Sequence, residues 1–409
     1  MNEKRIKKPN TLVWGLFVFA SKFLSKFMLN LKVNKEDFKK VKGPCLILAN
    51  HETSIDFICL AAALKRKAHF VISNSFYQIN PIKPLLDASR VIPKQQFQTS
   101  LSDMRIIKGA SENEIPLIIY PAGMMTENGV TTPIPLATGK TAKWLNQDVY
   151  IAYTKGSYLT NPKWGKKWRK GRIDLSIKKL YSKEELQQTD AEIIQKRIEE
   201  ELYYDAYENQ EELMIKYKGG DNIEGLEKVL YWCPKCNSYH TNEVIDKNKL
   251  VCSKCGNTAI ANEYGFLEKG TEDSVIFKHP SKWSLKIKNL IKEDIINNDS
   301  FCLEDTCEIQ MINFKKKKYE TVGHGKISLN KTHFHLIGEA NGEAFDRLLD
   351  LNLYPILPFK AGERFELQDR NAIYRIILGT KEEATRWISA VEILYKLNHN
   401  IEIEKQPTK

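Results

Sequence analysis

Short apolar runs alternate with stretches of helical spacing along the first half of the chain. Between the runs, apolar side chains recur at three- and four-residue steps, which is typical of amphipathic helices. The apolar runs lie at residues 45–49, 68–73, 115–120, 149–154 and 172–177, and the helical stretches at 55–64, 100–111, 141–145 and 190–208. Strands that alternate with helices predict an α/β fold in which helices flank a mixed sheet.

The pattern changes after residue 215. Short strand-like runs surround two cysteine pairs, and after a basic linker the chain has the alternation of a β-rich domain, with turns expected at Gly323, Gly338, Gly342 and Gly362. Residues 381–397 have the pattern of an amphipathic closing helix. Because 409 residues exceed what one hydrophobic core usually supports, we expect several domains. The expected boundaries are 1–34 for an N-terminal segment, 35–215 for the α/β domain, 216–270 for the cysteine-rich part and 285–400 for the β-rich domain.

The N-terminal segment has the strongest apolar run, residues 12–20, and its apolar spacing continues with Lys22 and Lys26 expected on the opposite side. No run reaches the ~18 residues that a membrane-spanning helix needs. We interpret residues 1–34 as an amphipathic helix, or a helical hairpin, that lies in a membrane interface. Because the start is basic and Ala20 follows the apolar run, a signal peptide is the main alternative, and a core helix is a third.

The net charge is +11 and the sequence pI is near 9.0. Basic clusters at residues 4–8, 163–172 and 315–318 favour an anionic partner, either nucleic acid or acidic lipid. Trp164 and Trp168 lie within the second cluster, which suits an anionic membrane surface. A solvated lysine-rich exterior is the alternative for each cluster.

Four cysteines have the spacing of a metal site. Cys233 and Cys236 form one Cys-x-x-Cys pair, Cys252 and Cys255 form another, and fifteen residues separate the pairs. Four thiolates complete a tetrahedral zinc, so we expect a structural zinc ribbon, with two disulfides as the alternative. Reduced thiolates favour a cytoplasmic location. Zinc ribbons often bind nucleic acid, but the aromatic residues nearby equally suit a small ribbon core, so nucleic acid is the less favoured partner.

Two polar motifs follow predicted strands. Asn-His-Glu-Thr-Ser-Ile-Asp at residues 50–56 places His51 five residues before Asp56, and Tyr-Pro-Ala-Gly-Met-Met-Thr occupies residues 120–126. A histidine paired with a carboxylate can act as a general base with an orienting group. A packed histidine at a strand end is the alternative for His51.

Together these motifs resemble those of the glycerophospholipid acyltransferase family, whose type member is 1-acylglycerol-3-phosphate acyltransferase. The His51-x4-Asp56 spacing is similar to the first family motif, and Tyr120-Pro121-x-Gly123 is similar to its Phe-Pro-Glu-Gly block. Residues 89–94 fall where the family has a strand segment that ends in arginine, and residues 134–139 resemble its fourth block. The resemblance covers about residues 35–210 and implies an acyltransferase-type mixed sheet.

The implied activity is that of a membrane-associated O-acyltransferase. It would move a fatty acyl group from acyl-CoA or acyl-carrier protein to the hydroxyl of a lysophospholipid-like acceptor, such as lysophosphatidic acid. An alkanol is almost never ionised at neutral pH, so His51 would remove its proton as the oxygen attacks the thioester. Asp56 would orient the ring and stabilise the imidazolium. We expect the protein on the inner face of the cell membrane, because both substrates partition into bilayers.

The second motif departs from the family pattern. Ala122 and Met125 stand where the family has Glu and Arg, which the resemblance implies bind the phosphate and glycerol of the acceptor. Two alternatives follow: phosphate recognition has moved to other cations, or the acceptor is not a simple phosphate ester. The expected substrate-binding residues are Tyr120, Pro121, Gly123, Met125, Arg90, Lys94 and Lys140. We expect Glu127 to be a surface loop residue rather than a replacement for the missing Glu.

The same departure supports a second hypothesis, a catalytically degenerate lipid-binding scaffold or regulator that uses the zinc ribbon and the C-terminal domain. The C-terminal domain resembles a pleckstrin-homology or related lipid-binding β-barrel, with Trp387 on the closing helix. That resemblance implies that the basic cluster at 315–318 meets anionic headgroups.

Overall fold

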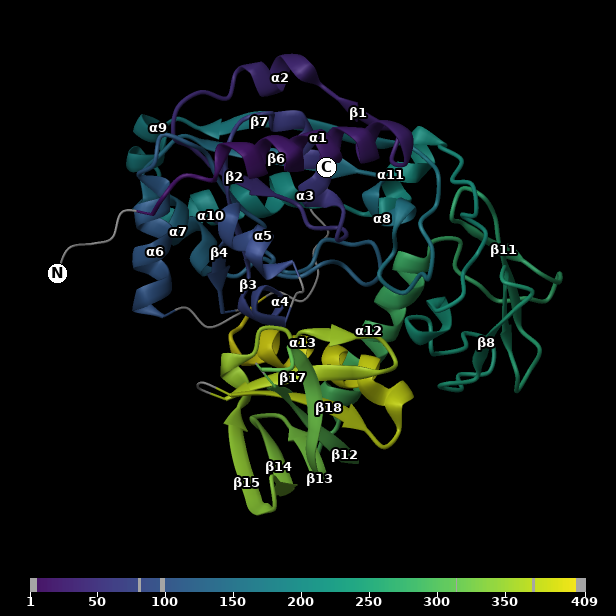
Figure 1. Cartoon of the computed structure of the whole chain (residues 1–409). Coiled ribbons are helices and arrows are strands. Elements are labelled where there is room, and N and C mark those ends of the chain that lie inside the picture. The colour runs from purple at the N-terminus through teal and green to yellow at the C-terminus, as the bar shows by residue number, and fades with distance from the viewer. Residues whose placement is uncertain (1–5, 80–81, 96–99, 314, 370–371, 402–409) are drawn as a thin grey trace. The chain divides into compact units, whose positions relative to one another are not determined.

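The computed structural model describes residues 6–79, 82–95, 100–313, 315–369 and 372–401 (Figure 1). The chain forms two compact units. The first consists of Met1–Lys163, Lys167–Gly220 and Glu263–Gly265, and the second of Trp164–Lys166, Asp221–Asn262 and Phe266–Lys409. Each unit has its own sheet or sheets.

A seven-stranded sheet forms the centre of the first unit, in the order β1-β7-β6-β2-β5-β3-β4. Neighbouring strands from β6 to β4 are parallel, β7 is antiparallel to β6, and β1 is parallel to β7. The predicted mixed sheet is therefore confirmed. Its strands are β1 (Leu31–Val33), β2 (Leu46–Ala49), β3 (His69–Ser73), β4 (Ile92–Lys94), β5 (Leu117–Ile119), β6 (Val149–Lys155) and β7 (Ile173–Tyr181).

Helices cover both faces of this sheet, which explains why β2 is apolar at every position. Ile47 and Ala49 pack into a core with residues of α1 and α3, whereas Leu46 and Leu48 pack into a second core with residues of α6, α7 and α10. The helices of this unit are α1 (Thr11–Phe27), α2 (Lys35–Lys39), α3 (Asp56–Leu64), α4 (Asn74–Ile79), α5 (Lys83–Ala88), α6 (Leu101–Ser111), α7 (Ala137–Leu145), α8 (Ser157–Thr160), α9 (Lys183–Gln188), α10 (Ala191–Leu202) and α11 (Ala206–Leu213).

The N-terminal segment is a single helix followed by an edge strand. Asn10 begins α1, since its side-chain oxygen accepts hydrogen bonds from the backbone N–H groups of Leu12 and Val13. β1 pairs with β7, so residues 31–33, expected in a separate membrane segment, belong to the sheet of the α/β domain. Among the described residues, we find no helix whose length and apolar content would let it span a bilayer.

The second unit contains a small sheet and a large one, both antiparallel. The small sheet has the order β11-β10-β9-β8, and the large sheet has the order β15-β14-β13-β12-β18-β17-β16. The small-sheet strands are β8 (Asn242–Ile245), β9 (Lys249–Cys252), β10 (Thr258–Ala261) and β11 (Leu267–Lys269). The large-sheet strands are β12 (Cys302–Asn313), β13 (Lys318–Asn330), β14 (His333–Ala340), β15 (Glu343–Asp350), β16 (Phe359–Lys360), β17 (Arg364–Asp369) and β18 (Ala372–Leu378).

Two helices, α12 (Pro280–Asn297) and α13 (Ala384–Asn398), and three 3-10 turns, η1 (Leu226–Lys228), η2 (Leu351–Leu353) and η3 (Lys381–Glu383), complete the second unit as described. The expected β-rich domain and its closing helix are present. The prediction that the β-rich segment begins at residue 285 was wrong, because residues 285–297 belong to helix α12. Pro280 occupies the first turn of α12, and buried side chains recur every four residues from Trp283 to Ile295, which is helical spacing.

Two of the four glycines expected in turns lie inside strands. A Cβ on Gly323 would come within 1.7 Å of the Glu339 carbonyl oxygen, and one on Gly338 within 2.3 Å of the His324 oxygen. These glycines allow β13 and β14 to approach closely rather than reverse the chain. Gly342 and Gly362 do lie in turns, with φ values of +79° and +59°.

The cysteine-rich part and the large sheet share one hydrophobic core. Trp232 and Leu250 pack into the same cluster as Trp283, Phe365 and Trp387. The Trp283 indole N–H donates a hydrogen bond to the Trp232 carbonyl at 3.0 Å. The two parts, expected as separate domains at 216–270 and 285–400, therefore form one packed body.

Candidate active site and metal centre

The two sequence motifs meet at the carboxyl edge of the parallel strands. His51 follows β2 and Tyr120 follows β5, and these strands are neighbours in the sheet. The His51 and Tyr120 rings lie 4.5 Å apart between centroids. The backbone N–H of Thr126 donates to the His51 carbonyl at 3.3 Å. Segments about seventy residues apart in sequence thus form one site, as is common at such sheet edges.

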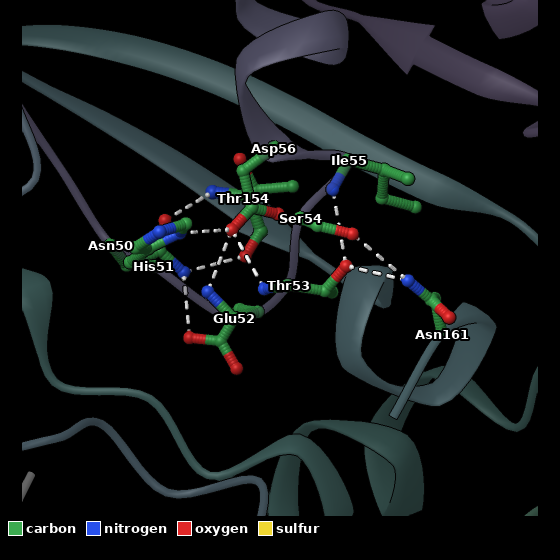
Figure 2. A network of polar contacts seen from close by, with 9 residues as sticks. All are labelled: Asn50, His51, Glu52, Thr53, Ser54, Ile55, Asp56, Thr154 and Asn161. Atoms are coloured by element: carbon green, nitrogen blue, oxygen red, sulfur yellow. Dashed lines mark hydrogen bonds and ion pairs between the residues drawn. The ribbon is translucent and has the colours of Figure 1, made fainter. Parts of the chain in front are cut away.

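His51 and Asp56 form a hydrogen-bonded pair (Figure 2). The distance between His51 Nδ1 and Asp56 Oδ2 is 3.0 Å, and the side chains are 21% and 1% exposed. A carboxylate at Nδ1 assigns the ring hydrogen to that nitrogen, so Nε2 carries the lone pair. The pair therefore leaves the second ring nitrogen of a partly exposed imidazole able to act as a base.

Backbone geometry fixes the Asp56 carboxylate. The same Oδ2 accepts hydrogen bonds from the N–H groups of Glu52 and Thr53, at 2.7 and 2.9 Å. Asp56 is also the first residue of α3, where the helix dipole favours a negative charge. Oδ1 is buried and has no hydrogen-bond partner within the described part of the chain. Asp56 therefore has a fixed orientation toward His51.

Asn50 and Glu52, which flank His51, have roles that the sequence reasoning missed. The Asn50 side chain bonds both the N–H and the carbonyl of Thr154 at 2.8 Å, which joins the end of β2 to β6. The Glu52 side chain is 0% exposed. Burial raises the pKa of Glu52 well above its usual range, the Asp56 charge raises it further, and an Asn50 hydrogen bond partly opposes them. In the sequence, the feature that could have indicated these roles is the run of five polar residues, 50–54, directly after a buried strand.

The second motif forms a tight turn at this edge. Gly123 has a φ of +67°, which favours glycine, and its N–H donates to the Tyr120 carbonyl at 3.0 Å. Ala122 and Met124 are buried, whereas Met125 and Pro121 are half-buried. The Tyr120 hydroxyl is buried without a hydrogen-bond partner among the residues described, and burial raises the pKa of Tyr120 well above its usual range.

The sequence suggested that Glu127 is a surface loop residue, but its side chain is nearly buried. Its side chain is 11% exposed and forms an ion pair with Lys163 at 2.9 Å, and Lys163 is 15% exposed. The sequence around Glu127 does not predict this ion pair, because Lys163 lies 36 residues further along the chain. A nearly buried acid–base pair is thus adjacent to the second motif in sequence.

The three candidate cations differ in position. Lys94 ends β4 at the carboxyl edge, and burial lowers the pKa of Lys94. Arg90 precedes β4 and is therefore at the opposite, amino edge, where its carbonyl accepts a hydrogen bond from the His69 ring at 3.0 Å. Lys140 is exposed in the first turn of α7. The structure thus brings Lys94, but not Arg90, to the edge that carries His51.

The basic cluster at 163–172 is not a continuous exposed surface. Arg169 and Trp164 are only 5% and 8% exposed, in addition to the paired Lys163. Trp168 is 43% exposed and Lys167 and Lys170 are exposed. Three of the residues expected to face an anionic partner are therefore enclosed by protein.

The four ribbon cysteines converge on one point. All four sulfur atoms lie within 4.8 Å of one another, and the Cys233–Cys255 and Cys236–Cys252 sulfur distances are both 3.7 Å. A tetrahedral zinc with ~2.3 Å bonds to sulfur requires sulfur–sulfur edges of about 3.8 Å. A disulfide would need about 2.0 Å. The donor set therefore fits a four-thiolate metal site.

Each cysteine pair ends in the same turn. Asn237 and Gly256 directly follow the second cysteine of their pairs, and their φ values are +57° and +71°. Their N–H groups donate to the carbonyls of Cys233 and Cys252, both at 2.9 Å. Two equivalent knuckles thus present the four sulfurs.

Comparison with known proteins finds similarity in the part of the chain that contains both motifs. The acyltransferase family model matches residues 30–152, which include both motifs. Among solved structures, the chain is similar to the 1-acyl-sn-glycerophosphate (LPA) acyltransferase PlsC from Thermotoga maritima, with 17% identity over 46% of this chain and 78% of that chain and a TM-score of 0.36. It is also similar to the Ran-binding domain of Nup2 from Ashbya gossypii, with 15% identity over 24% of this chain and 92% of that chain and a TM-score of 0.19. Residues 30–152, about a third of the chain, thus match the acyltransferase family model.

Proposed function

We propose that this protein is a membrane-associated O-acyltransferase. It moves a fatty acyl group from acyl-CoA or acyl-carrier protein to the hydroxyl of a lysophospholipid-like acceptor. The observation that carries the proposal is the 3.0 Å contact between His51 Nδ1 and Asp56 Oδ2, within the residues that match the acyltransferase family. Because the partner occupies Nδ1, Nε2 of this partly exposed side chain is left for a substrate hydroxyl.

In the proposed reaction the substrate supplies the nucleophile. His51 Nε2 takes the hydroxyl proton as the acceptor oxygen bonds to the thioester carbonyl carbon. When the carbon–sulfur bond breaks, the thiolate leaves and takes the proton back from the imidazolium, so His51 is regenerated. Asp56 stabilises the imidazolium between these steps. Each turnover yields an ester and a free thiol, and no acyl-enzyme is needed.

The acceptor is proposed to be recognised differently from a family member with Glu and Arg in the second motif. Ala122 is buried and Met125 is half-buried, so this wall of the site is apolar. Lys94 supplies a positive charge at the same sheet edge. A lysolipid whose phosphate reaches Lys94, or an acceptor without a phosphate, fits this distribution of charge.

A membrane location is supported by the surface of α1, because its exposed side carries many large apolar residues. Its side facing α3 includes Ser21 and Ser25 beside Trp14 and Val18. Its outer side is apolar, and the exposed fractions are 74% for Leu12, 61% for Leu16, 70% for Phe19, 55% for Phe23 and 61% for Phe27. We call these five residues the α1 stripe. Such a surface suits the headgroup–acyl boundary of a bilayer, on the cytoplasmic face for a thiolate-rich protein.

Lysines accompany the α1 stripe. They had been expected on the opposite side of the helix, but Lys26 lies beside the stripe, with Nζ 5.3 Å from the centre of the Phe27 ring. Lys22 and Lys26 are both exposed. A lysine at this level reaches anionic headgroups while its stem stays in the interface.

The four-cysteine site is proposed to hold a structural zinc. Cys233, Cys236, Cys252 and Cys255 would provide all four ligands, which leaves no position for a catalytic water. The metal would fix the two knuckles, and through them the core that the ribbon shares with the large sheet. Binding of the C-terminal part to anionic headgroups stays a prediction. Lys316 and Lys318 of the expected contact cluster both pair with Glu320, at 2.8 and 3.3 Å.

The decisive experiment compares the full chain with His51→Ala in vesicles that contain a labelled acyl donor and a panel of lysolipids with and without phosphate. We expect His51→Ala to lower kcat by about 100-fold or more, the usual contribution of a general base. His335→Ala, which changes a half-buried histidine of the second unit that also pairs with a carboxylate, is the matched control and should retain activity. Equal rates for wild type and His51→Ala would overturn the base, and no product with any acceptor would favour the lipid-binding scaffold.

A further inference from the structure

Glu52 lies between His51 and Asp56 in the sequence, and its carboxyl group is fully buried. Its Oε1 accepts a hydrogen bond from Asn50 Nδ2 at 3.2 Å. Its Oε2 is buried and has no hydrogen-bond partner among the described residues. Figure 2 shows the Glu52 side chain directed away from the His51–Asp56 contact, while its backbone N–H takes part in holding Asp56. The side chain and the backbone of one residue thus serve two neighbouring contacts.

The surroundings of Glu52 disfavour a negative charge. The carboxyl groups of Asp56 in α3 and of Asp205, which caps α11, both interact electrostatically with the Glu52 carboxyl group. The hydroxyl groups of Tyr153 in β6 and of Tyr204 are also close enough to interact with it electrostatically. Burial and these two acids raise the pKa of Glu52, and the Asn50 hydrogen bond offsets them only in part. Two ionised carboxylates in one buried turn would repel each other, which favours the protonated form of Glu52.

Asn50 links this carboxyl group to the scaffold. The Asn50 amide donates to both Glu52 Oε1 and the Thr154 carbonyl, and its oxygen accepts from the Thr154 N–H. Glu52 therefore helps fix the side chain that joins β2 to β6 immediately before His51. Loss of this contact would free Asn50 and loosen the turn that carries the base.

We propose that Glu52 is a positioning residue that holds the His51 turn in its protonated, uncharged form and so leaves Asp56 as the single negative charge of that turn. This inference rests on the proposed acyl-transfer function. Ionisation of Glu52 at high pH would repel Asp56 and disturb its contact with His51. The protein then loses activity on the alkaline side through a residue that never touches the substrate.

Glu52→Ala, Glu52→Gln and Glu199→Gln test this role. Glu199 of α10 is a matched control, since burial also raises its pKa and its Oε1 accepts a hydrogen bond from the Gln195 amide at 2.6 Å. We expect Glu52→Ala to lower kcat by about 10- to 100-fold, as misplacement of a catalytic group does. Glu52→Gln, which is neutral and similar in shape, restores most of that loss and extends the activity to higher pH. Glu199→Gln follows the wild-type pH profile.

Two measurements on the free protein separate this inference from the proposed function. The infrared difference between wild type and Glu52→Gln at neutral pH should contain the carbonyl band of a protonated carboxylic acid. The wild type should also lose stability relative to Glu52→Gln as pH rises from the unfolded pKa, about 4.3, through the raised folded pKa. An ionised Glu52 in the infrared spectrum, or a folded Glu52→Gln as inactive as Glu52→Ala, would overturn the inference. Both physical readouts hold even if no acyl transfer is found.

Discussion

At the scale of single residues, the geometry of the site depends on one carboxylate oxygen, Asp56 Oδ2. One oxygen of Asp56 receives the His51 ring and two backbone N–H groups. This arrangement explains why four residues separate His51 from Asp56. The turn formed by those residues must bring the backbone N–H groups of Glu52 and Thr53 to the Asp56 carboxylate. Ala122 and Met125 stand where the resembled family has Glu and Arg, and the His51–Asp56 contact forms without those two charged residues.

Tyr120 provides a residue-scale prediction. Its buried hydroxyl lacks a hydrogen-bond partner within the described chain, so Tyr120→Phe removes an unsatisfied polar group and keeps the ring beside His51. We expect the free energy of unfolding to rise by about 1 kcal/mol, measured by denaturant titration. Tyr158→Phe is the comparison, because the Tyr158 hydroxyl donates to the Glu127 carbonyl at 3.0 Å and its loss should destabilise. A destabilised Tyr120→Phe would show that the hydroxyl has a partner, and a stable variant with a raised KM would indicate that this partner is the substrate.

At the scale of elements, most strands and helices of the first unit lie where the apolar pattern predicts them. The pattern failed for residues 285–297, where a helical repeat of Trp and Ile was included in a β-rich segment. It also failed for Gly323 and Gly338, because composition does not distinguish a glycine that reverses the chain from one that admits a neighbouring strand. The pattern predicted an amphipathic helix at α1, but it placed Lys22 and Lys26 opposite the apolar side, whereas they are exposed together with it.

The α1 stripe leads to a prediction for this element. The double variant Phe19→Glu and Phe23→Glu should weaken binding to anionic vesicles by about 100-fold, because burial of each apolar side chain contributes roughly 1.5 kcal/mol or more. Flotation or sedimentation with vesicles measures this. Ile193→Glu is the control, since Ile193 is 57% exposed on α10 and is not part of the stripe. Unchanged partitioning of a folded double variant would contradict a membrane role for α1.

At the scale of the whole molecule, the chain has two units with separate cores, and the four-cysteine cluster lies in the second. The ribbon contributes Trp232 and Leu250 to a core that also contains Trp387, and His240 pairs with Glu383 at 2.9 Å. The ribbon is thus part of the structural support for the large sheet. Proposed catalysis and proposed zinc binding reside in different units.

Removal of the metal should therefore affect one unit. With a zinc chelator, or with Cys252→Ser, we expect the thermal transition of the second unit to shift to lower temperature, while that of the first unit is unchanged. Structural zinc contributes folding free energy directly, so the shift should be large and reversed by added zinc. Calorimetry resolves the transitions and metal analysis gives the stoichiometry. Cys302→Ser, which alters an exposed thiol of the same unit, should have no such effect, and a chelator-insensitive protein without bound metal would refute the zinc site.

The sequence alone determined the features that depend on local spacing: the alternation of strands and helices, the His51–Asp56 interval and the paired cysteines. Such features are encoded within a few residues, since side-chain periodicity and motif spacing are properties of a short stretch of chain. Only the tertiary structure decided which distant groups meet, because these contacts depend on strand order. It placed Lys94 at the carboxyl edge and Arg90 at the amino edge, paired Glu127 with Lys163, and buried the side chain of Glu52, the residue after His51.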